Sequence, residues 1–152
     1  MSLNQEVEML RAVPLFAKIE PSKLKLLAFT SERLSFDSGQ ELCHQGDMGD
    51  AMYVIMDGVA DVSIDTPNGA LRVAELKKND FVGEIAILCD VPRTATVTAR
   101  ERLTTLKITK DLFFRLVQEF PQMAVEIMRE LAHRLELTNA QLRAVRAGQK
   151  AS

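Results

Sequence analysis

The chemistry in this sequence is concentrated in FVGEIAILCDVPRTATV, residues 81–97, where an acid and a base interrupt an apolar segment. Glu84 directly follows Gly83, and Arg93 lies nine positions further along the chain. A glycine before a helical turn lets a ligand approach the backbone, and the unpaired N–H groups of that turn attract anions. The guanidinium of Arg93 fits phosphate oxygens bidentately. An ionised carboxylate only accepts hydrogen bonds, so a sugar hydroxyl is the natural partner of Glu84.

Glycine, helical turn, arginine and carboxylate together predict a phosphorylated sugar bound inside a β-barrel. The competing interpretation is an ion pair between Glu84 and Arg93 that only closes the loop, because buried charges are usually paired. The spacing of the two residues does not separate these alternatives.

The elements that must position these residues begin with two helices and a β-rich region. Residues 3–33 have a helical pattern that breaks between residues 13 and 16, and a second helix is expected to begin at Pro21, where the missing N–H does no harm. Residues 34–109 alternate short β-rich runs with Gly, Asp and Asn turns, at spacings of about 8 to 12 residues. This pattern is typical of a sandwich or barrel of about seven or eight strands.

Residues 110–147 return to a helical pattern, which Pro121 divides into a short helix of about 110–119 and a long one from about residue 122. The long helix carries a stripe with the alternating spacing of a heptad seam. Its members are Met128, Leu131, Leu135, Thr138, Leu142 and Val145. The stripe either packs on the β-domain or joins two chains. Because this helix is expected to project beyond the domain after about residue 136, we expect a homodimer.

Composition limits the remaining possibilities. The 152 residues fit one domain, and a net charge of −2 creates no global field that favours nucleic acid or a membrane. Cys43 and Cys89 form no CxxC motif and no secretory leader is recognisable, so a reducing, cytoplasmic setting is expected. No apolar run approaches the roughly 18 residues needed to span a bilayer.

Two motifs, in the right order, carry a resemblance to a known family. FVGEIAILCDVPRTATV resembles the phosphate-binding cassette of the cyclic-nucleotide-binding domains, and LCHQGDMGDAMYVIMDG, residues 42–58, is similar to that family's glycine-punctuated hairpin. The matching residues are Gly83, Glu84, Pro92, Arg93, Thr94 and Ala95 in the first motif, and Gly46, Asp47, Tyr53 and Gly58 in the second. The resemblance covers almost the whole chain.

The resemblance implies a mainly β fold with flanking helices: an eight-stranded jelly-roll barrel (double-stranded β-helix), N-terminal helices and a long C-terminal helix. It also implies roles. Glu84 accepts a hydrogen bond from the ribose 2′-hydroxyl, and Arg93 pairs with the cyclic phosphate, helped by backbone N–H groups near Ile85, Ala86 and Thr94. The long C-terminal helix supplies a lid over the base. No cofactor and no metal are expected.

The choice between cAMP and cGMP depends on other residues. In the family, a Thr or Ser after the arginine can bond the guanine 2-amino group, so Thr94 leaves cGMP open, although it is also simply suited to a strand start. Residues 131–142 are similar to the central helix of the catabolite activators, where two polar positions, here Thr138 and Asn139, read adenine, one from each subunit. These two can equally be polar residues on a solvated helix. Arg134 is a second lid candidate that can stack on the base, and cAMP is favoured.

The favoured function is a non-catalytic cAMP sensor, whose ligand draws the C-terminal helices onto the barrel for an unknown effector protein to read. A cGMP sensor and an oligomerisation module with a vestigial cassette are alternatives; the intact Glu84 and Arg93 argue against the second. A cupin-type metal enzyme is disfavoured because His44 and His133 lie in different elements without an HxH pair. The helix-turn-helix module of the catabolite activators is missing, so nucleic acid is not an expected partner, and the chain is either a stand-alone sensor or a fragment.

Overall fold

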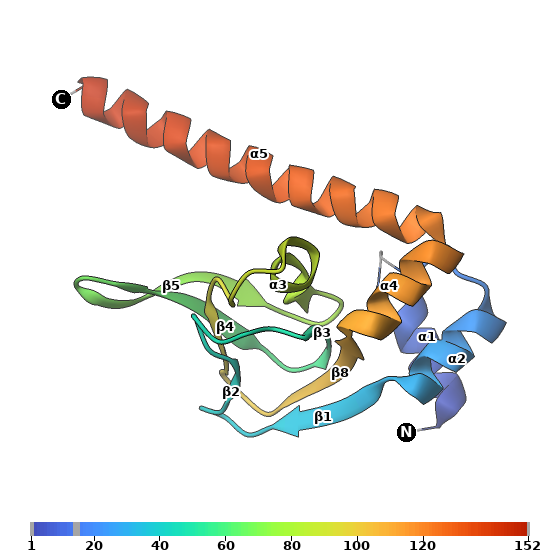
Figure 1. Ribbon diagram of the computed structural model, residues 1–152. Helices are drawn as coiled ribbons and strands as arrows, with labels where there is room; N and C mark the ends of the chain where they lie inside the picture. Colours follow the sequence, from blue (N-terminus) through green and yellow to red (C-terminus); the bar gives the residue numbers. More distant parts are fainter. Residues whose placement is uncertain (1, 14–15, 152) are drawn as a thin grey trace.

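Eight strands form two four-stranded antiparallel sheets (Figure 1). The computed structural model describes residues 2–13 and 16–151, except for the side chains of Ile85 and of residues 145–151. One sheet has the order β1-β8-β3-β6 and the other β2-β7-β4-β5. The first contains β1 (Glu32–Phe36), β3 (Ala51–Asp57), β6 (Phe81–Val82) and β8 (Leu103–Thr109); the second contains β2 (Glu41–Cys43), β4 (Ala60–Thr66), β5 (Gly69–Leu76) and β7 (Thr96–Ala99).

Strand β3 separates two hydrophobic cores. Its side chains alternate, so that Tyr53 and Ile55 pack between the sheets while Met52 and Val54 pack against the helices. A strand buried on both faces has a near-continuous apolar sequence, which explains the run MYVIM. The position of β3 therefore fixes the helical layer and the second sheet relative to each other.

The prediction of a mainly β fold with eight strands and flanking helices is confirmed, and the two sheets are broadly consistent with the predicted jelly roll, but they do not close into a barrel. Within the residues that the structure describes, no strand pairing joins the two sheets. The chain crosses from one sheet to the other after β1, at a turn where Gly39 has a φ of +91°. Strands β2 and β6, of three and two residues, are too short to close the edges.

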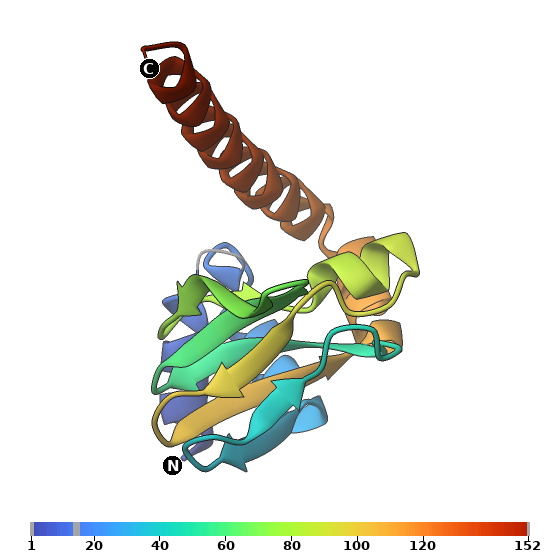
Figure 2. The same cartoon turned by 90° about the vertical axis from the view of Figure 1, so that its left-hand side faces the viewer.

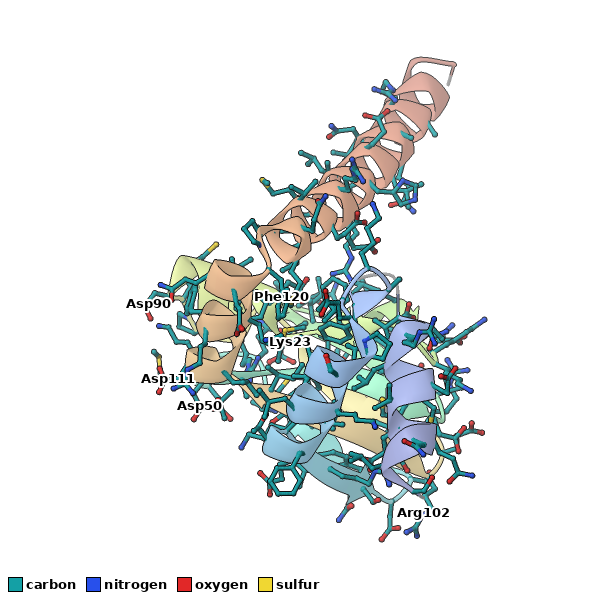
Figure 3. All side chains as sticks on the ribbon, turned by 90° about the vertical axis from the view of Figure 1, so that its right-hand side faces the viewer. Lys23, Asp50, Asp90, Arg102, Asp111 and Phe120 are labelled. Atoms are coloured by element: carbon teal, nitrogen blue, oxygen red, sulfur yellow. The ribbon has the colours of Figure 1, made fainter. Side chains whose placement is uncertain are left out.

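Within the described part of the chain, five α-helices complete the fold: α1 (Leu3–Arg11), α2 (Pro21–Thr30), α3 (Glu84–Cys89), α4 (Lys110–Glu119) and α5 (Pro121–Ala151). Helix α2 begins at Pro21, as predicted, and α4 and α5 meet at Phe120, beside the predicted break at Pro121 (Figure 3). Apolar side chains of α1, α2, α4 and α5 cover the outer face of the first sheet. The short helix α3 lies between the strands and α5 (Figure 1).

Among the described side chains of helix α5, those that are buried against the body lie in its first half, and the second half extends away (Figure 2). In the heptad stripe, Met128, Leu135 and Leu142 are 59%, 61% and 57% exposed, whereas Leu131 packs against the helical core. The stripe as a whole therefore does not pack on the β-domain; the side chain of Val145 lies outside the described residues. None of the described helices is long and apolar enough to cross a membrane.

Candidate functional site

A pocket of about 490 Å³ lies between the second sheet, α3 and the first half of α5. Its volume is typical of small-molecule sites. The residues of the predicted site that line it are Gly83, Glu84, Ala86, Arg93, Thr94 and Arg134. Thr138 and Asn139 do not line it, and the side chain of Ile85 is outside the described residues. The structure thus brings six of the nine predicted residues to one cavity.

Arg93 is almost completely buried at one end of this pocket, with 7% of its surface exposed. One terminal nitrogen donates to the carbonyl of Ala51 at 2.7 Å, and the other donates to the carbonyl of Gly83 at 3.4 Å. The guanidinium carbon lies 5.8 Å from the centre of the Tyr53 ring, within the range of a cation–π interaction. These contacts hold the guanidinium in place but do not neutralise it.

The alternative of an ion pair between Glu84 and Arg93 is wrong. Among the residues that the structure describes, no carboxylate lies within ion-pairing distance of Arg93, whose partners are carbonyls and an aromatic ring. A buried charge without a counterion is costly, so an anion that enters the pocket gains the full interaction with this guanidinium. The Arg93 end of the pocket is therefore suited to a phosphate.

Two glycines make room for Arg93. A Cβ atom at Gly83 would lie 2.5 Å from the guanidinium, and the φ of +99° at this residue also favours glycine. A Cβ atom at Gly49 would lie 2.6 Å from Nε of Arg93 and 2.8 Å from Cβ of Ala86. The sequence motifs did not single out Gly49; the second glycine of the GDMGD run was the signal available. Glycine is required at position 49 because the side chains of Arg93 and Ala86 approach its backbone closely.

The two sequence motifs meet around the backbone of Arg93. Its amide donates to the carbonyl of Asp47 at 2.7 Å, and its carbonyl accepts from the amide of Gly46 at 2.9 Å. Next to this pair, the amide of Gln45 donates to the Thr96 hydroxyl at 2.9 Å. The loop between β2 and β3 therefore fixes the segment that carries Arg93.

Glu84 pairs with Arg134 from α5 instead of Arg93. Oε1 of Glu84 lies 2.7 Å from a terminal nitrogen of Arg134, which is 38% exposed, while the Glu84 side chain is 2% exposed. Arg134 also donates to the carbonyl of Phe81 and to Glu130, both at 3.3 Å, and its guanidinium carbon lies 5.2 Å from the centre of the Phe81 ring. Burial raises the pKa of the Glu84 carboxyl, and the charge of Arg134 acts in the opposite direction.

The opposite wall of the pocket is apolar and belongs to the hairpin of β4 and β5. Val62 and Ile64 come from β4, and Val73 and Ala74 from β5. Thr94 is exposed and also contributes to the lining. A ligand can therefore place a flat ring on this surface while an anionic group attached to that ring reaches Arg93.

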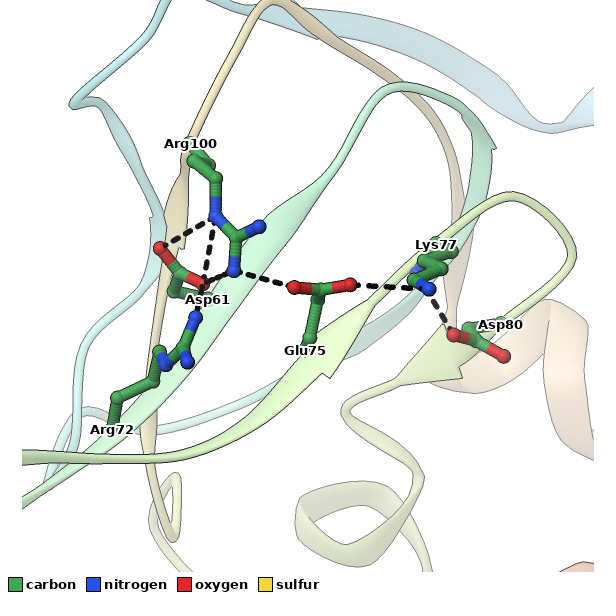
Figure 4. A network of polar contacts seen from close by, with 6 residues as sticks. All are labelled: Asp61, Arg72, Glu75, Lys77, Asp80 and Arg100. Atoms are coloured by element: carbon green, nitrogen blue, oxygen red, sulfur yellow. Dashed lines mark hydrogen bonds and ion pairs between the residues drawn. The ribbon is translucent and has the colours of Figure 1, made fainter.

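A network of charges ties this hairpin to the end of β7 (Figure 4). Arg100 donates to Asp61 on β4 and forms an ion pair of 2.6 Å with Glu75 on β5. Hydrogen bonds from Arg100 lower the pKa of both carboxyls. Arg72 and Lys77 add contacts at 3.4 Å and 3.3 Å to Asp61 and Glu75, respectively.

Thr138 and Asn139 are exposed in the projecting half of α5. The hydroxyl of Thr138 donates to the carbonyl of Arg134, one turn earlier in the same helix, at 3.0 Å. In this arrangement neither residue contacts the pocket of its own chain, and their predicted contact with a base stays a prediction.

The histidines and cysteines are dispersed. His44 is exposed and pairs with Glu41 at 2.9 Å, which raises its pKa, and His133 is exposed on α5. Cys43 lines the pocket, where burial raises the pKa of its thiol, and Cys89 is an exposed free thiol. Across the described part of the chain, no three His, Cys, Asp or Glu side chains are grouped to hold a metal ion.

Comparison with known proteins agrees with this geometry. Residues 33–120 match the family described as the cyclic nucleotide-binding domain. The chain belongs to this family. The match includes the β2–β3 loop, α3 and Arg93, and therefore most of the pocket wall.

A cAMP-dependent protein kinase regulatory subunit of Eremothecium gossypii is 37% identical over 110 residues, which are 72% of this chain and 23% of that protein. A lysophospholipase of Neosartorya fischeri is 30% identical over 118 residues, 77% of this chain and 8% of that protein. The catabolite activator protein of Thermus thermophilus superposes with a TM-score of 0.79 and 25% identity, over 87% of this chain and 62% of that one. The chain thus spans about a quarter of the kinase regulatory subunit that it matches.

Proposed function

We propose that this domain is a non-catalytic sensor of cAMP. The observation that carries the proposal is the buried guanidinium of Arg93, which faces a pocket of about 490 Å³ without a carboxylate partner among the described residues. A cyclic phosphate supplies the missing negative charge. Charge-assisted hydrogen bonds to such a group contribute about 1.5–3 kcal/mol each.

The rest of the pocket suits the remaining parts of a nucleotide. Glu84 can accept a hydrogen bond from the ribose 2′-hydroxyl, and the apolar wall of Val62, Ile64 and Val73 can receive the purine. The similarity to regulatory subunits of cAMP-dependent protein kinases favours adenine. Thr94 is exposed and lines the pocket, and it supports cGMP as the second candidate ligand.

Ligand occupancy would be transmitted through α5. The helix reaches the pocket with Arg134 and presents Met128, Leu135 and Leu142 to solvent on a heptad seam. We propose that this seam pairs with a second copy of the chain, which would also bring the partner's Thr138 and Asn139 near the base. A kinase-like effector, suggested by the regulatory subunits, would read the resulting arrangement.

Calorimetric titration of the chain with cAMP and cGMP tests the function. Arg93→Ala removes both bonds of the bidentate contact, so it is expected to weaken cAMP binding by about 150-fold or more, the equivalent of about 3 kcal/mol or more. Arg102→Ala is the matched control, because Arg102 is an exposed arginine whose ion pair with Asp37 lies outside the pocket lining, and it should leave affinity unchanged. Absence of binding of both nucleotides to the wild-type chain would refute the proposal.

Light scattering after size exclusion tests the dimer. The wild-type chain of 17.0 kDa is expected to elute with twice this mass, and the double variant Leu135→Glu/Leu142→Glu with the mass of one chain. Both residues are exposed, so the charges should not unfold the domain. A monomeric wild type at micromolar concentration, with and without cAMP, would contradict pairing through α5.

A further inference from the structure

Helix α5 contributes a second carboxylate to the pocket, at a residue with no part in the phosphate and sugar contacts described above. Glu130 lies on α5 and lines the pocket together with Arg134. The side chain of Glu130 is 44% exposed, so a ligand in the pocket can reach it. Its position opposite the apolar wall of β4 and β5 makes it a candidate for contact with the base.

One of the two carboxylate oxygens of Glu130 is free. Oε1 accepts a hydrogen bond from Nε of Arg134 at 3.3 Å. Oε2 makes no hydrogen bond or ion pair with any residue that the structure describes. An ionised carboxylate accepts hydrogen bonds and donates none. Glu130 therefore offers the pocket a hydrogen-bond acceptor and no donor.

The other carboxylates in the pocket lining have partners of their own. Both oxygens of Glu75 are held in the charge network (Figure 4). An oxygen of Asp80 accepts from the amide of Lys77 at 2.8 Å, which turns this side chain back into its own turn. Glu84 is assigned to the ribose. Glu130 is thus the carboxylate of the lining that is best placed to serve the base.

The order of the polar groups along the pocket follows the order of the parts of a nucleotide. Arg93 is suited to the phosphate and Glu84 to the sugar. The guanidinium of Arg134 then lies between two carboxylates, 2.7 Å from Oε1 of Glu84 and 3.3 Å from Oε1 of Glu130. Glu130 is therefore separated from the sugar site by a single guanidinium, and the base is the part of the ligand that comes next.

We propose that Glu130 accepts a hydrogen bond from the 6-amino group of adenine and thereby selects adenine over purines with a carbonyl group at position 6. This inference rests on the proposed function, because it places the purine of a cyclic nucleotide on the apolar wall. Adenine presents a donor at N6, whereas guanine presents an acceptor at O6. An acceptor-only carboxylate pairs with the first group and repels the second. The preference for adenine is then independent of Thr94.

Inosine 3′,5′-cyclic phosphate (cIMP) isolates the contact at position 6, because it has a carbonyl group there and lacks the 2-amino group of cGMP. Calorimetric titration of the whole chain should show that cAMP binds about tenfold more tightly than cIMP. In Glu130→Gln the amide oxygen stays with Nε of Arg134, so the amide N–H₂ group faces the pocket and donates to a carbonyl. This variant should bind cIMP at least as tightly as cAMP.

Glu130→Leu removes acceptor and donor alike, so its affinities for cAMP and cIMP should agree within about twofold. Glu126→Gln is the matched control, since Glu126 lies one turn earlier on α5, pairs with Arg129 and does not line this pocket. It should keep the wild-type ratio of the two affinities.

The ratio of affinities separates recognition of the base from a structural role. If Glu130 only supports Arg134, Glu130→Gln weakens both nucleotides equally and leaves the ratio unchanged, which would overturn the inference. A ratio that responds to Asp80→Asn and not to Glu130→Gln would overturn it too. Equal binding of cAMP and cIMP by the wild type would overturn the inference while the sensor function stands. A wild type that binds no cyclic nucleotide would overturn the proposed function itself.

Discussion

Replacing Gly49 by alanine places a methyl group against the guanidinium of Arg93. The new Cβ atom would lie 2.6 Å from Nε and 2.7 Å from the guanidinium carbon of Arg93, with Cβ of Ala86 at 2.8 Å on another side. Ordinary van der Waals contact begins near 3.4 Å, so the guanidinium has to withdraw by roughly 0.8 Å. The backbone at Gly49 is not in the left-handed region, so the substitution acts through this clash alone.

The size of the effect follows from the geometry of hydrogen bonds. A shift of this size lengthens a 2.9 Å contact beyond the range of a good hydrogen bond. Losing one of the two N–H···O bonds of a bidentate grip costs about 1.5–3 kcal/mol, because the acceptor is charged. Gly49→Ala should therefore weaken cAMP binding roughly 10- to 150-fold.

Gly46→Ala is the control in the same loop. Nothing lies within 4 Å of a Cβ atom at Gly46, but its φ of +93° strains any other residue, at a cost of about 1–2 kcal/mol. This variant should lose stability in urea and keep its affinity for cAMP, whereas Gly49→Ala should lose affinity. Calorimetric titration and urea unfolding of both variants give the comparison. If Gly49→Ala binds cAMP within twofold of the wild type while Arg93→Ala does not, the steric argument is refuted.

Two further predictions concern stability. Hydrogen bonds from Arg100 lower the pKa of Asp61 and Glu75 from their ordinary values of 3.8 and 4.5. The network therefore stabilises the fold fully at a pH above these ordinary pKa values. The stabilisation is lost as the pH falls through the lowered pKa values of the folded protein. Arg100→Met should therefore be less stable than the wild type in urea at pH 7, and the difference should shrink below about pH 4; a pH-independent difference would contradict it. Met123 is 1% exposed, so Met123→Ala should lower the free energy of unfolding by about 2–5 kcal/mol in the same urea assay. Met128 is 59% exposed, so Met128→Ala should lower it by less than about 0.5 kcal/mol. Equal losses of stability in the two variants would contradict the packing of α5.

Local sequence signals predicted the helices and strands well, but they did not predict that the two sheets would stay separate instead of closing into a barrel. Pro21 marked the start of α2, and Pro121 marked the division between α4 and α5. Turn residues separated the eight strands. Whether two sheets join at their edges depends on pairing between strands that are distant in sequence, and the three residues of β2 and the two of β6 are too few to carry such a signal.

The candidate site was predictable where one short motif supplies the residues. Gly83, Glu84 and Arg93 lie in one segment, and the structure places all three on the pocket. The pairing of Glu84 was not predictable, because its partner Arg134 is 50 positions away and the nearer Arg93 is an equally plausible partner by charge. Gly49 escaped attention because its function is to leave space, which a single sequence does not reveal.

Helix α5 contacts the body and the pocket with one face, and the proposed pairing with a second chain would use another face. Ile127 and Arg134, seven residues apart, face the body, whereas Met128, Leu135 and Leu142 repeat at the same interval about 100° further round the helix. The face that contacts the body and the face with the exposed seam therefore do not overlap. The helix has 31 residues and is about 46 Å long, so a change of tilt where Arg134 meets the pocket is amplified along the exposed seam.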